Sequence, residues 1–371
     1  MRMVFLSLSA RVEVNVEAFN AVETVGNLTK HRKAPMIIST DAGYRLVYVP
    51  AVSGEAVANA YQRALVELSK IMYPSNPPLT EWDMRGEFIK FADNNHLTPE
   101  LNKLINEYKI KKQSKKGAEE IGDIQRIKHD FEKIAVKQSI VCDVGGFLYT
   151  GDIPVKRTSR LYTGYMLPVY DAIDVTAIEA QLHARHMHSE TVGRGEEERG
   201  AAEERRATQM IYYVEVSSTI YGLSISLDLS GIGRTSLVRV EDVVDRNERL
   251  RRVSIATAAL QALFLGTGLG AKLSRFTPVK RIVSAVATVT HPTNFTVSPA
   301  QIKSYVQDTV NRAHSYGEML RKIGVTPEIK VLVYGETPKK PGEIEIIETR
   351  DPEEFLSKLI DKALELCNKY C

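Results

Sequence analysis

A chain of 371 residues, 43% hydrophobic and 26% charged, has the composition of a globular protein and the length to bury a large core. Its formal net charge of +3 is too small to indicate nucleic-acid binding, so only local clusters of charge carry information. Three cysteines without a CxxC pair indicate neither a disulfide framework nor a zinc site, and no apolar run approaches the ~18 residues of a membrane span. Because the N-terminus lacks the features of a signal peptide, we expect a cytoplasmic protein outside the membrane.

The chain begins with a strict alternation of apolar and polar residues. Apolar side chains occupy every second position from Val4 to Val16. This period of two predicts a long strand with one face in a core and the other in water. We expect the polar face to be an open working surface of the sheet.

A polar and basic loop follows at residues 27–33 and is closed by Pro35. It holds four potential cations in sequence: Lys30, His31, Arg32 and Lys33. One interpretation is a solvated loop ahead of a hairpin. The other is a loop that grips phosphate.

A hairpin and a helix come next. Residues 36–49 predict a hairpin that turns at residues 41–43. Ser53 is a good N-cap for an amphipathic helix, whose apolar stripe runs from Val57 to Met72 and ends before Pro74. A strand, a loop and a packed helix in this order begin a ferredoxin-like, RRM-type fold.

Residues 73–139 break this pattern. The segment opens with three prolines, carries a lysine run at residues 109–116, and predicts helices at residues 99–108 and 118–137. We interpret it as a helical lid inserted into the fold. The lysine run is typical of a solvated face, and the alternative is an edge that binds nucleic acid.

The most informative stretch runs from residue 141 to residue 168. Its apolar start and the Gly145-Gly146 pair predict a strand followed by a close approach of the backbone. Lys156, Arg157 and Arg160 follow, with tyrosines interleaved among them. Cations bind phosphate and aromatic rings accept stacked bases, so one interpretation of the stretch is a ligand-binding surface for these groups. A kinked core strand with a solvated basic loop is the alternative.

Residues 178–187 predict a strand whose polar face carries Gln181, His183 and Arg185. His183 and His186 differ in parity and no carboxylate completes a ligand set, so we expect no metal site. His183 beside Arg185 suits a contact with RNA sugar or phosphate.

The second half of the chain continues with a charged segment of low complexity at residues 189–207, which predicts a flexible loop. A strand at residues 211–229, a helix at residues 245–265 and a strand at residues 282–290 follow. The remaining tail predicts a helix, two strands and a final helix: residues 299–323, 329–334, 344–347 and Asp351 onward.

A glycine-rich loop at residues 266–275 lies between the second helix and the last core strand. It includes Lys272 and Arg275, and its amide groups could hold phosphate. The spacing is neither a dinucleotide fingerprint, which needs a strand before the loop, nor a Walker loop.

Several stretches together resemble one family. DVGGFLYTG and PVKRTSRLYTGYMLP, within residues 143–168, resemble the central segment of the DevR family of CRISPR-associated proteins, the backbone subunit of archaeal type I-A Cascade complexes. Residues 15–35 resemble the family's first strand and loop, and EAQLHAR at residues 179–185 resembles its histidine-bearing strand. The glycine-rich loop at residues 266–275 resembles the hallmark of the wider RAMP superfamily.

This resemblance implies an α+β fold, with a ferredoxin-like antiparallel sheet, helices on one face and large insertions. The implied core is formed by residues 1–72 and 140–292. Residues 73–139 are then the inserted lid, residues 186–210 a charged loop that could be a thumb, and residues 293–371 an accessory α/β element.

The resemblance also implies a function. We expect a non-catalytic subunit that multimerises along CRISPR guide RNA, presents it for pairing with target DNA, and contacts other Cascade subunits without a cofactor. The implied RNA-binding residues share polar or basic side chains in the matching stretches: Asn20, Asn27, Lys30, His31, Arg32, Lys156, Arg157, Arg160, His183, Arg185, Lys272 and Arg275.

Two alternatives stay open. In one, the protein is a RAMP-type ribonuclease with His183 or His31 as the general acid-base. No second histidine or tyrosine is placed by the sequence as an obvious partner. In the other, it is a transcriptional autoregulator, although no helix-turn-helix is evident.

Overall fold

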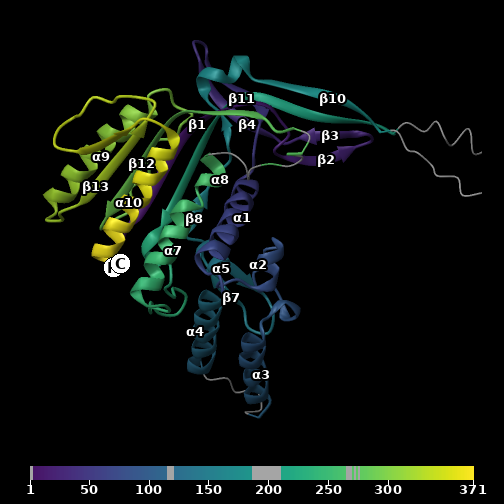
Figure 1. Cartoon of the computed structure of the whole chain (residues 1–371), viewed down its shortest axis with the longest axis vertical. Helices are drawn as coiled ribbons and strands as arrows, with labels where there is room; N and C mark the ends of the chain where they lie inside the picture. Colours follow the sequence, from purple (N-terminus) through teal and green to yellow (C-terminus); the bar gives the residue numbers. More distant parts are fainter. Residues whose placement is uncertain (1–2, 115–120, 186–209, 265–269, 271–272, 275) are drawn as a thin grey trace, which may run out of the picture.

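The computed structural model describes residues 3–114, 121–185, 210–264, 270, 273–274 and 276–371. The predictions of a flexible loop at residues 189–207 and of phosphate binding by Lys272 and Arg275 therefore lie outside the described residues. Within the described part the fold is α+β, built on a large mixed sheet with helices on both faces (Figure 1).

The long strand β1 (Phe5–Glu17) is central to the sheet. It pairs antiparallel with β11 (Met210–Asp228) on one side and with β12 (Val279–His291) on the other. Beyond β12 the sheet continues with β13 (Glu328–Tyr334) and then β14 (Glu345–Thr349). Five shorter strands extend it on the β11 side: β2 (Ala21–Val25), β3 (Leu28–His31), β8 (Leu161–Thr163), β9 (Leu167–Pro168) and β10 (Ala177–Arg185).

Among the described residues, several helices pack on one face of the sheet, and α5 (Ile140–Gly145) also contributes to their core. They are α1 (Gly54–Met72), α7 (Arg246–Ala258), α8 (Gln261–Phe264) and α10 (Pro352–Tyr370). The alternating apolar side chains of β1 from Leu6 to Val14 are buried in this core, as predicted, whereas Val16 is 52% exposed. The predicted helix caps are also confirmed, because Ser53 accepts from the first turn of α1 and Asp351 from that of α10.

The opposite face of β1 is buried as well, which corrects the prediction of an open polar face. Ser7 is 2% exposed and Arg11 is 7% exposed. Ser7 accepts a hydrogen bond from the amide of Val297 at 3.2 Å, and Arg11 Nε donates to the carbonyl oxygen of Ala300 at 3.0 Å. Residues 295–300 and α9 (Tyr305–Lys322) cover this side of the sheet, so the C-terminal element closes the surface that sequence periodicity left open.

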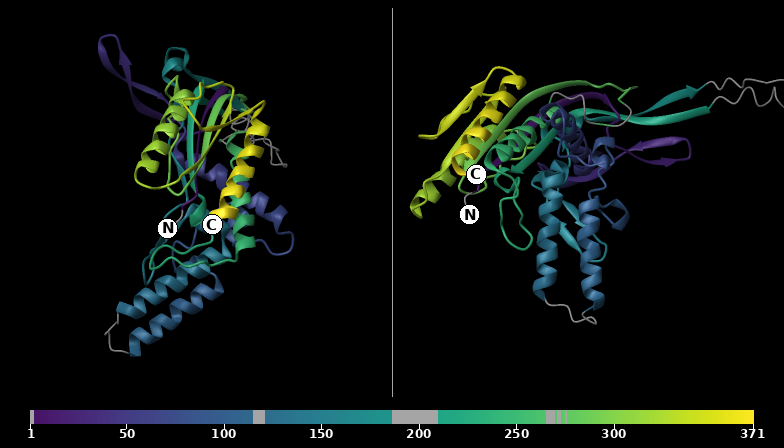
Figure 2. Two further views of the ribbon diagram at one scale, coloured as in Figure 1. Left: turned by 90° about the vertical axis from the view of Figure 1, so that its left-hand side faces the viewer. Right: turned by 60° about the horizontal axis from the view of Figure 1, so that its bottom comes forward.

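An inserted lobe projects below the sheet (Figures 1 and 2). We use this name for residues 73–157, because the apolar cluster of the segment includes Phe131 and also Phe147 and Val155. Its elements are α2 (Glu81–Arg85), η1 (Asn94–His96), α3 (Pro99–Ser114), α4 (Ile121–Gln138), α5 (Ile140–Gly145), β6 (Phe147–Tyr149) and β7 (Val155–Arg157). The helices predicted at residues 99–108 and 118–137 are present as α3 and α4, and the packed unit continues beyond residue 139.

The start of the central stretch is a helix, where the sequence predicted a strand. Ser139 accepts a hydrogen bond from the amide of Cys142 at 3.0 Å and so caps α5. The expected close approach is present at Gly146, which has φ +67° and where a Cβ would lie 2.5 Å from the carbonyl oxygen of Arg157.

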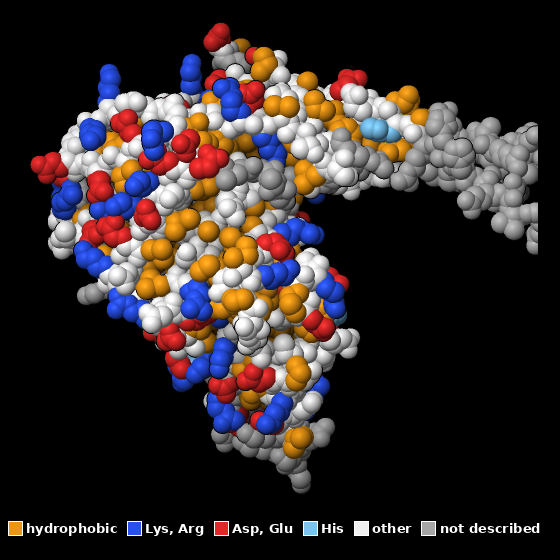
Figure 3. Space-filling view, in the orientation of Figure 1, with side chains coloured by type: hydrophobic (Ala, Val, Ile, Leu, Met, Phe, Trp, Pro, Cys, Tyr) orange, Lys and Arg blue, Asp and Glu red, His pale blue; other side chains and the backbone are white. Residues whose placement is uncertain are grey.

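Two further projections complete the molecule. The predicted hairpin is confirmed as β4 (Lys33–Thr40) and β5 (Gly43–Pro50), with Thr40 paired to Gly43 across the turn. An arm formed by β2, β3, β10 and the first part of β11 extends away from the sheet. Figure 3 shows the hollow between this arm and the inserted lobe.

Candidate nucleic-acid interface

A cleft of about 530 Å³ lies beside the first turn of α1. It is lined by residues from the end of the arm, from α1 and from the inserted lobe. Residues within 159–165, in and around β8, complete the lining. Its polar and charged lining residues are Arg32, Ser53, Glu55, Gln62, Lys90, Ser159, Thr163 and Tyr165. The cleft therefore joins segments that are far apart in the sequence, including two that the motifs singled out.

The predicted residue Asn20 holds two walls of this cleft together. Its side-chain Oδ1 accepts a hydrogen bond from the amide of Ser53 at 2.8 Å, and its carbonyl oxygen accepts from the amide of Arg32 at 2.9 Å. On the other wall, Thr163 Oγ1 donates to the carbonyl oxygen of Gly54 at 3.0 Å. Asn20 thus positions Arg32 and the start of α1, and it does not itself line the cleft.

The cleft combines positive charge with an aromatic ring. The N-terminus of α1 carries the positive end of a helix dipole, which favours anions. The Arg32 guanidinium lies 6.0 Å from the ring centroid of Tyr165 and donates to its hydroxyl at 3.3 Å. Lys90 Nζ donates to the carbonyl oxygen of Gly145 at 3.3 Å, and burial lowers the pKa of Lys90 from its ordinary value. Glu55 is the acidic residue of the lining.

Two polar atoms of the lining have no partner in the protein. Gln62 is 7% exposed, and its Nε2 donates to the carbonyl oxygen of Ala58 while its buried Oε1 accepts nothing. The buried Nε of Arg32 likewise has no acceptor. Buried polar groups are nearly always satisfied, so the cleft offers one acceptor and one donor to a ligand. A ribose hydroxyl and a phosphate oxygen would satisfy them.

His31, adjacent to Arg32, lies inside the protein, although the sequence predicted it to contact RNA. Its Nε2 is 2.7 Å from Glu17 Oε1, and both side chains are fully buried. Glu17 also accepts hydrogen bonds from the hydroxyls of Ser217 and Tyr221. Burial favours neutral His31, yet the hydrogen bond and charge of Glu17 outweigh it and raise the pKa of His31. His31 therefore anchors the strands and we no longer expect it to hold phosphate.

Arg157 and Arg160 also form ion pairs with carboxylates inside the protein. Arg157 is fully buried and pairs with Glu132 at 2.9 Å and with Asp143 at 2.6 Å. Arg160 is 11% exposed and pairs with Asp228 at 3.0 Å. These two arginines fasten the inserted lobe and the sheet to residues 228–234, and this structural role replaces the predicted phosphate contact.

Three predicted residues lie at the surface outside the cleft. Lys156 is exposed on β7. Lys30 lies 3.8 Å from Glu23 within the β2–β3 pair, and Asn27 donates from Nδ2 to a carbonyl oxygen of β11 at 3.4 Å. Asn27 and Lys30 therefore belong to the arm, and Lys156 to the inserted lobe.

His183 also lies on the arm, between two aromatic rings. It stacks on Tyr212 with ring centroids 5.2 Å apart and meets the edge of Phe276 at 5.3 Å. Its buried Nε2 has no partner. Arg185 ends β10 opposite Met210. Its side chain and the residues Lys272 and Arg275 lie outside the described part.

Of the predicted site residues that the structure describes, only Arg32 lines the cleft, and the lining residues that sequence reasoning missed include Gln62 and Lys90. Gln62 lies within an amphipathic helix, where an isolated glutamine has no distinguishing pattern. Lys90 follows α2 and has φ +55°, a conformation that no local motif indicates. Neither residue could be found without the tertiary contact between α1 and the inserted lobe.

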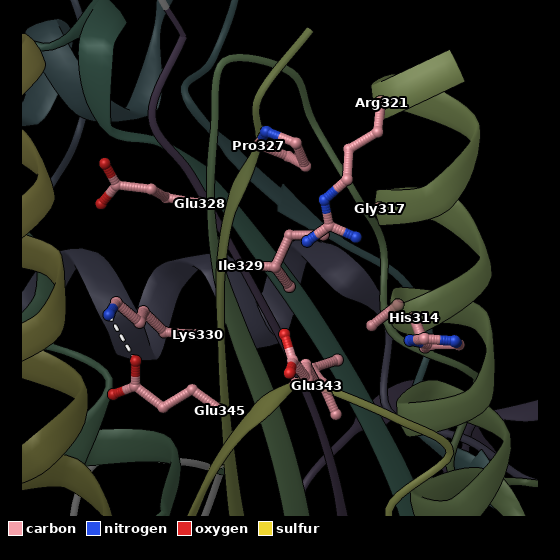
Figure 4. A pocket seen from close by; sticks show the side chains of 11 residues that line it. His314, Gly317, Arg321, Pro327, Glu328, Ile329, Lys330, Glu343 and Glu345 are labelled. Carbon is pink, nitrogen blue, oxygen red and sulfur yellow. Dashed lines mark hydrogen bonds and ion pairs between the residues drawn. The ribbon is translucent and has the colours of Figure 1, made fainter.

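A second cavity, of about 210 Å³, lies between α9 and β13 (Figure 4). Arg321 and Glu343 point into it. Arg321 already pairs with Glu318 at 2.5 Å, and Glu343 adds negative charge, so this cavity is a poorer anion site than the cleft. Within the described ranges there is no group of three His, Cys, Asp or Glu residues that could hold a metal ion. No helix among these residues is long and apolar enough to span a membrane.

Comparison with known proteins identifies the family. The family described as "CRISPR-associated negative auto-regulator DevR/Csa2" matches residues 8–310. The chain is 36% identical over 312 residues to "CRISPR-associated aCascade subunit Cas7/Csa2 2" of Saccharolobus solfataricus, covering 83% of this chain and 86% of that protein. It is 27% identical to "CRISPR-associated protein Cas7/Cst2/DevR" of Methanocaldococcus jannaschii, covering 96% of this chain and 99% of that one.

Among solved structures, a chain of a "CRISPR RNA-guided surveillance complex, pre-nicking" aligns over 97% of this chain and 99% of its own. It is 10% identical, with a TM-score of 0.48. The sequence matches decide the assignment, because they cover most of the chain at substantial identity. The chain belongs to the DevR/Csa2 family of CRISPR-associated proteins.

Proposed function

We propose that this protein is a non-catalytic RNA-binding subunit that multimerises along CRISPR guide RNA in a type I-A Cascade complex. There it presents the guide for pairing with target DNA. The observation that carries the proposal is the cleft, where a helix N-terminus, Arg32, Lys90 and the unpartnered Gln62 Oε1 meet. The relative named as an aCascade subunit supports the assembly.

The chemistry of the cleft favours the sugar-phosphate backbone over the bases. A helix terminus and cations attract phosphate without regard to sequence. Gln62 adds an acceptor that a 2′-hydroxyl would fill, and Tyr165, 45% exposed, adds a ring on which any base can stack. Because guide sequences vary, such a sequence-blind surface suits a backbone subunit.

We infer further that the core is ferredoxin-like. In chain order its elements are β1, α1, β8, β11, α7 and β12, and its strands lie side by side in the order β12, β1, β11, β8. This is the β-α-β-β-α-β arrangement with antiparallel neighbours. The inserted lobe then interrupts the connection from α1 to β8, and the C-terminal element extends the β12 edge.

Copies of the protein would meet head to tail along the RNA. One cleft accommodates few nucleotides, so a longer RNA requires more subunits in a repeating, heterologous contact. The arm and the inserted lobe border the hollow seen in Figure 3 and are the natural parts to reach neighbouring copies. Other Cascade subunits would bind at the ends of the array.

A ribonuclease is the second candidate, and His183 is the residue that favours it. Its buried Nε2 makes no hydrogen bond in the protein, whereas both ring nitrogens of His31 are occupied. A substrate would reach this atom only if the packing around His183 opened. Purified protein that cuts RNA, and loses this activity on His183→Ala, would establish the ribonuclease and remove the non-catalytic proposal.

The experiment that tests the main proposal measures RNA affinity as a function of salt. For single strands, log affinity falls with log salt by about 0.7 per neutralised phosphate. Arg32→Ala should weaken binding and flatten this slope by about that amount per bound subunit. Arg350→Ala is the matched control, since this arginine is 86% exposed and lies outside the cleft.

Two results would contradict the proposal. One is an equal loss of affinity in the Arg32→Ala and Arg350→Ala variants, which would indicate non-specific charge. The other is strong preference for one short sequence over scrambled RNA of equal length. The mass of the protein–RNA complex, measured by native mass spectrometry on RNAs of increasing length, should rise in steps of one subunit. A complex that keeps one subunit per strand at every length would refute the repeating array but not RNA binding itself.

A further inference from the structure

Two of the three cysteines lie together at the end of α10, far in sequence from the cleft. The sulfur atoms of Cys367 and Cys371 are 3.0 Å apart. Cys367 is 1% exposed, whereas Cys371 is partly exposed. The third thiol, Cys142, is fully buried in the inserted lobe. The pair therefore joins one buried and one partly exposed cysteine through their sulfur atoms.

Charged side chains of both signs surround Cys371, and among them Asp228 disfavours its thiolate. Its main-chain carbonyl oxygen accepts hydrogen bonds from Arg249 Nη1 at 2.8 Å and from Arg234 Nη2 at 3.0 Å. Asp242 pairs with both arginines and offsets part of their charge. The hydrogen bond with Cys367, followed by the charges of the two arginines, lowers the pKa of Cys371 despite burial. The same contact raises the pKa of Cys367. Thiolate is the reactive form, so Cys371 is the more nucleophilic of the two.

We propose that Cys367 and Cys371 form a thiol pair that undergoes exchange with disulfide reagents, with Cys371 as the attacking thiol and Cys367 as the resolving thiol. This thiol chemistry does not depend on whether the protein binds RNA. Within the described residues no third ligand accompanies these two thiols, so they fall short of a zinc site.

The exchange balances in two steps with a small disulfide RSSR as the oxidant. The Cys371 thiolate attacks one sulfur of RSSR, expels RS⁻ and forms the mixed disulfide Cys371–S–S–R. The Cys367 thiol then loses its proton, attacks the Cys371 sulfur and expels the second RS⁻. Overall, two thiols become one disulfide, and their two electrons and two protons leave as two RSH.

The bond requires the last turn of α10 to rearrange. Residues four apart in an α-helix have Cα atoms about 6 Å apart, within the range that disulfides span. Their sulfurs must approach by about 1 Å to reach a bond of about 2.05 Å. The Cβ atoms of residues four apart in a helix lie about 5–6 Å from each other, farther than the about 3.5–4.5 Å of a disulfide, so the last turn of α10 must open. The hydrogen bond broken by this opening runs from the amide of Cys371 to the carbonyl oxygen of Cys367 at 2.8 Å.

The test uses the full chain, oxidised glutathione as the probe, and intact mass with thiol counting after denaturation. Reduced protein should show three free thiols. After treatment the wild type should show one, Cys142, with a mass lower by about 2 Da and no retained adduct. Cys367→Ser should keep one glutathione on Cys371, because the resolving thiol is gone. Cys371→Ser should acquire no adduct, because Cys367 is buried.

A second measurement separates the arginine effect from simple exposure. Arg234→Gln should slow the reaction of Cys371 with a maleimide severalfold without changing its accessibility to a large excess of reagent. The proposal is overturned if three thiols remain after treatment, if the wild type retains glutathione, or if the bond that forms includes Cys142. Equal maleimide rates for wild type and Arg234→Gln would remove the assigned role of the arginine charge.

Discussion

Asp143 joins the inserted lobe to the core, and its removal should be strongly destabilising. Its carboxylate accepts from Arg157 Nη2 at 2.6 Å and from Arg252 Nη1 at 2.9 Å. It also accepts from the amide of Gly233 at 2.9 Å. All three side chains of this ion-paired cluster are 0–2% exposed.

Asp143→Ala would leave two buried guanidinium groups with less compensating charge and one buried amide without an acceptor. Removing one member of a buried ion pair typically costs about 3–5 kcal/mol, and an orphaned buried amide costs about 1–3 kcal/mol within that total. Glu132 and Glu248 still face the two arginines, so the expected loss is about 3–4 kcal/mol, in the lower part of that range.

Urea denaturation of the purified variant measures this loss directly. Glu67→Ala is the control, since Glu67 pairs with Lys70 on the exposed face of α1 at 2.8 Å and should contribute about 0–1 kcal/mol. A loss below about 1.5 kcal/mol for Asp143→Ala would refute the argument that this cluster fastens the lobe.

Three further predictions concern buried groups. The pKa of His31 is raised above 6.5 and that of Glu17 is lowered below 4.5, so their pairing stabilises most between these pH values. The wild type should therefore lose stability relative to His31→Gln as pH rises above 6.5, and parallel pH profiles would contradict this. Gly146→Ala should lower the free energy of unfolding by more than about 1 kcal/mol, because residue 146 has a positive φ and faces the carbonyl oxygen of Arg157. An unchanged melting temperature would show that the added methyl group causes no strain there. Gln62→Leu should leave the free protein as stable or more stable while weakening RNA binding, and undiminished affinity would show that its Oε1 contacts no ligand.

Local patterns predicted most elements because each depends on a short-range signal. The alternation in β1, the N-cap at Ser53 and the proline after Asp351 fix where elements begin and which face is apolar. The prediction failed at Ile140–Gly145, where a serine cap and contacts with α4 favour a helix over the strand that the apolar run indicated. The prediction that the polar face of β1 is open failed for a related reason, because a segment nearly 300 residues away in the sequence covers this face.

The candidate site was less predictable than the fold, because charge in a sequence does not reveal its partner. Arg32 and Arg157 look equivalent in basic stretches, yet Arg32 borders a cleft and Arg157 neutralises Glu132 and Asp143 inside the protein. The partners of Arg157 come from two different helices of the inserted lobe. Only the tertiary structure decides which cations remain available to a ligand.

Burial of both faces of β1 constrains where the proposed RNA-binding surface can lie. RRM-type modules stack two or three bases on the exposed face of their sheet, which makes them selective for sequence. Here residues 295–300 cover that face at Ser7 and Arg11, so this part of the sheet cannot serve as a stacking platform. The cleft instead lies beside the first turn of α1, where RNA would meet helix amides, cations and one unpartnered amide oxygen. Such groups contact phosphate and ribose, which are the same in every nucleotide. The covered sheet therefore favours a binder that tolerates any guide sequence.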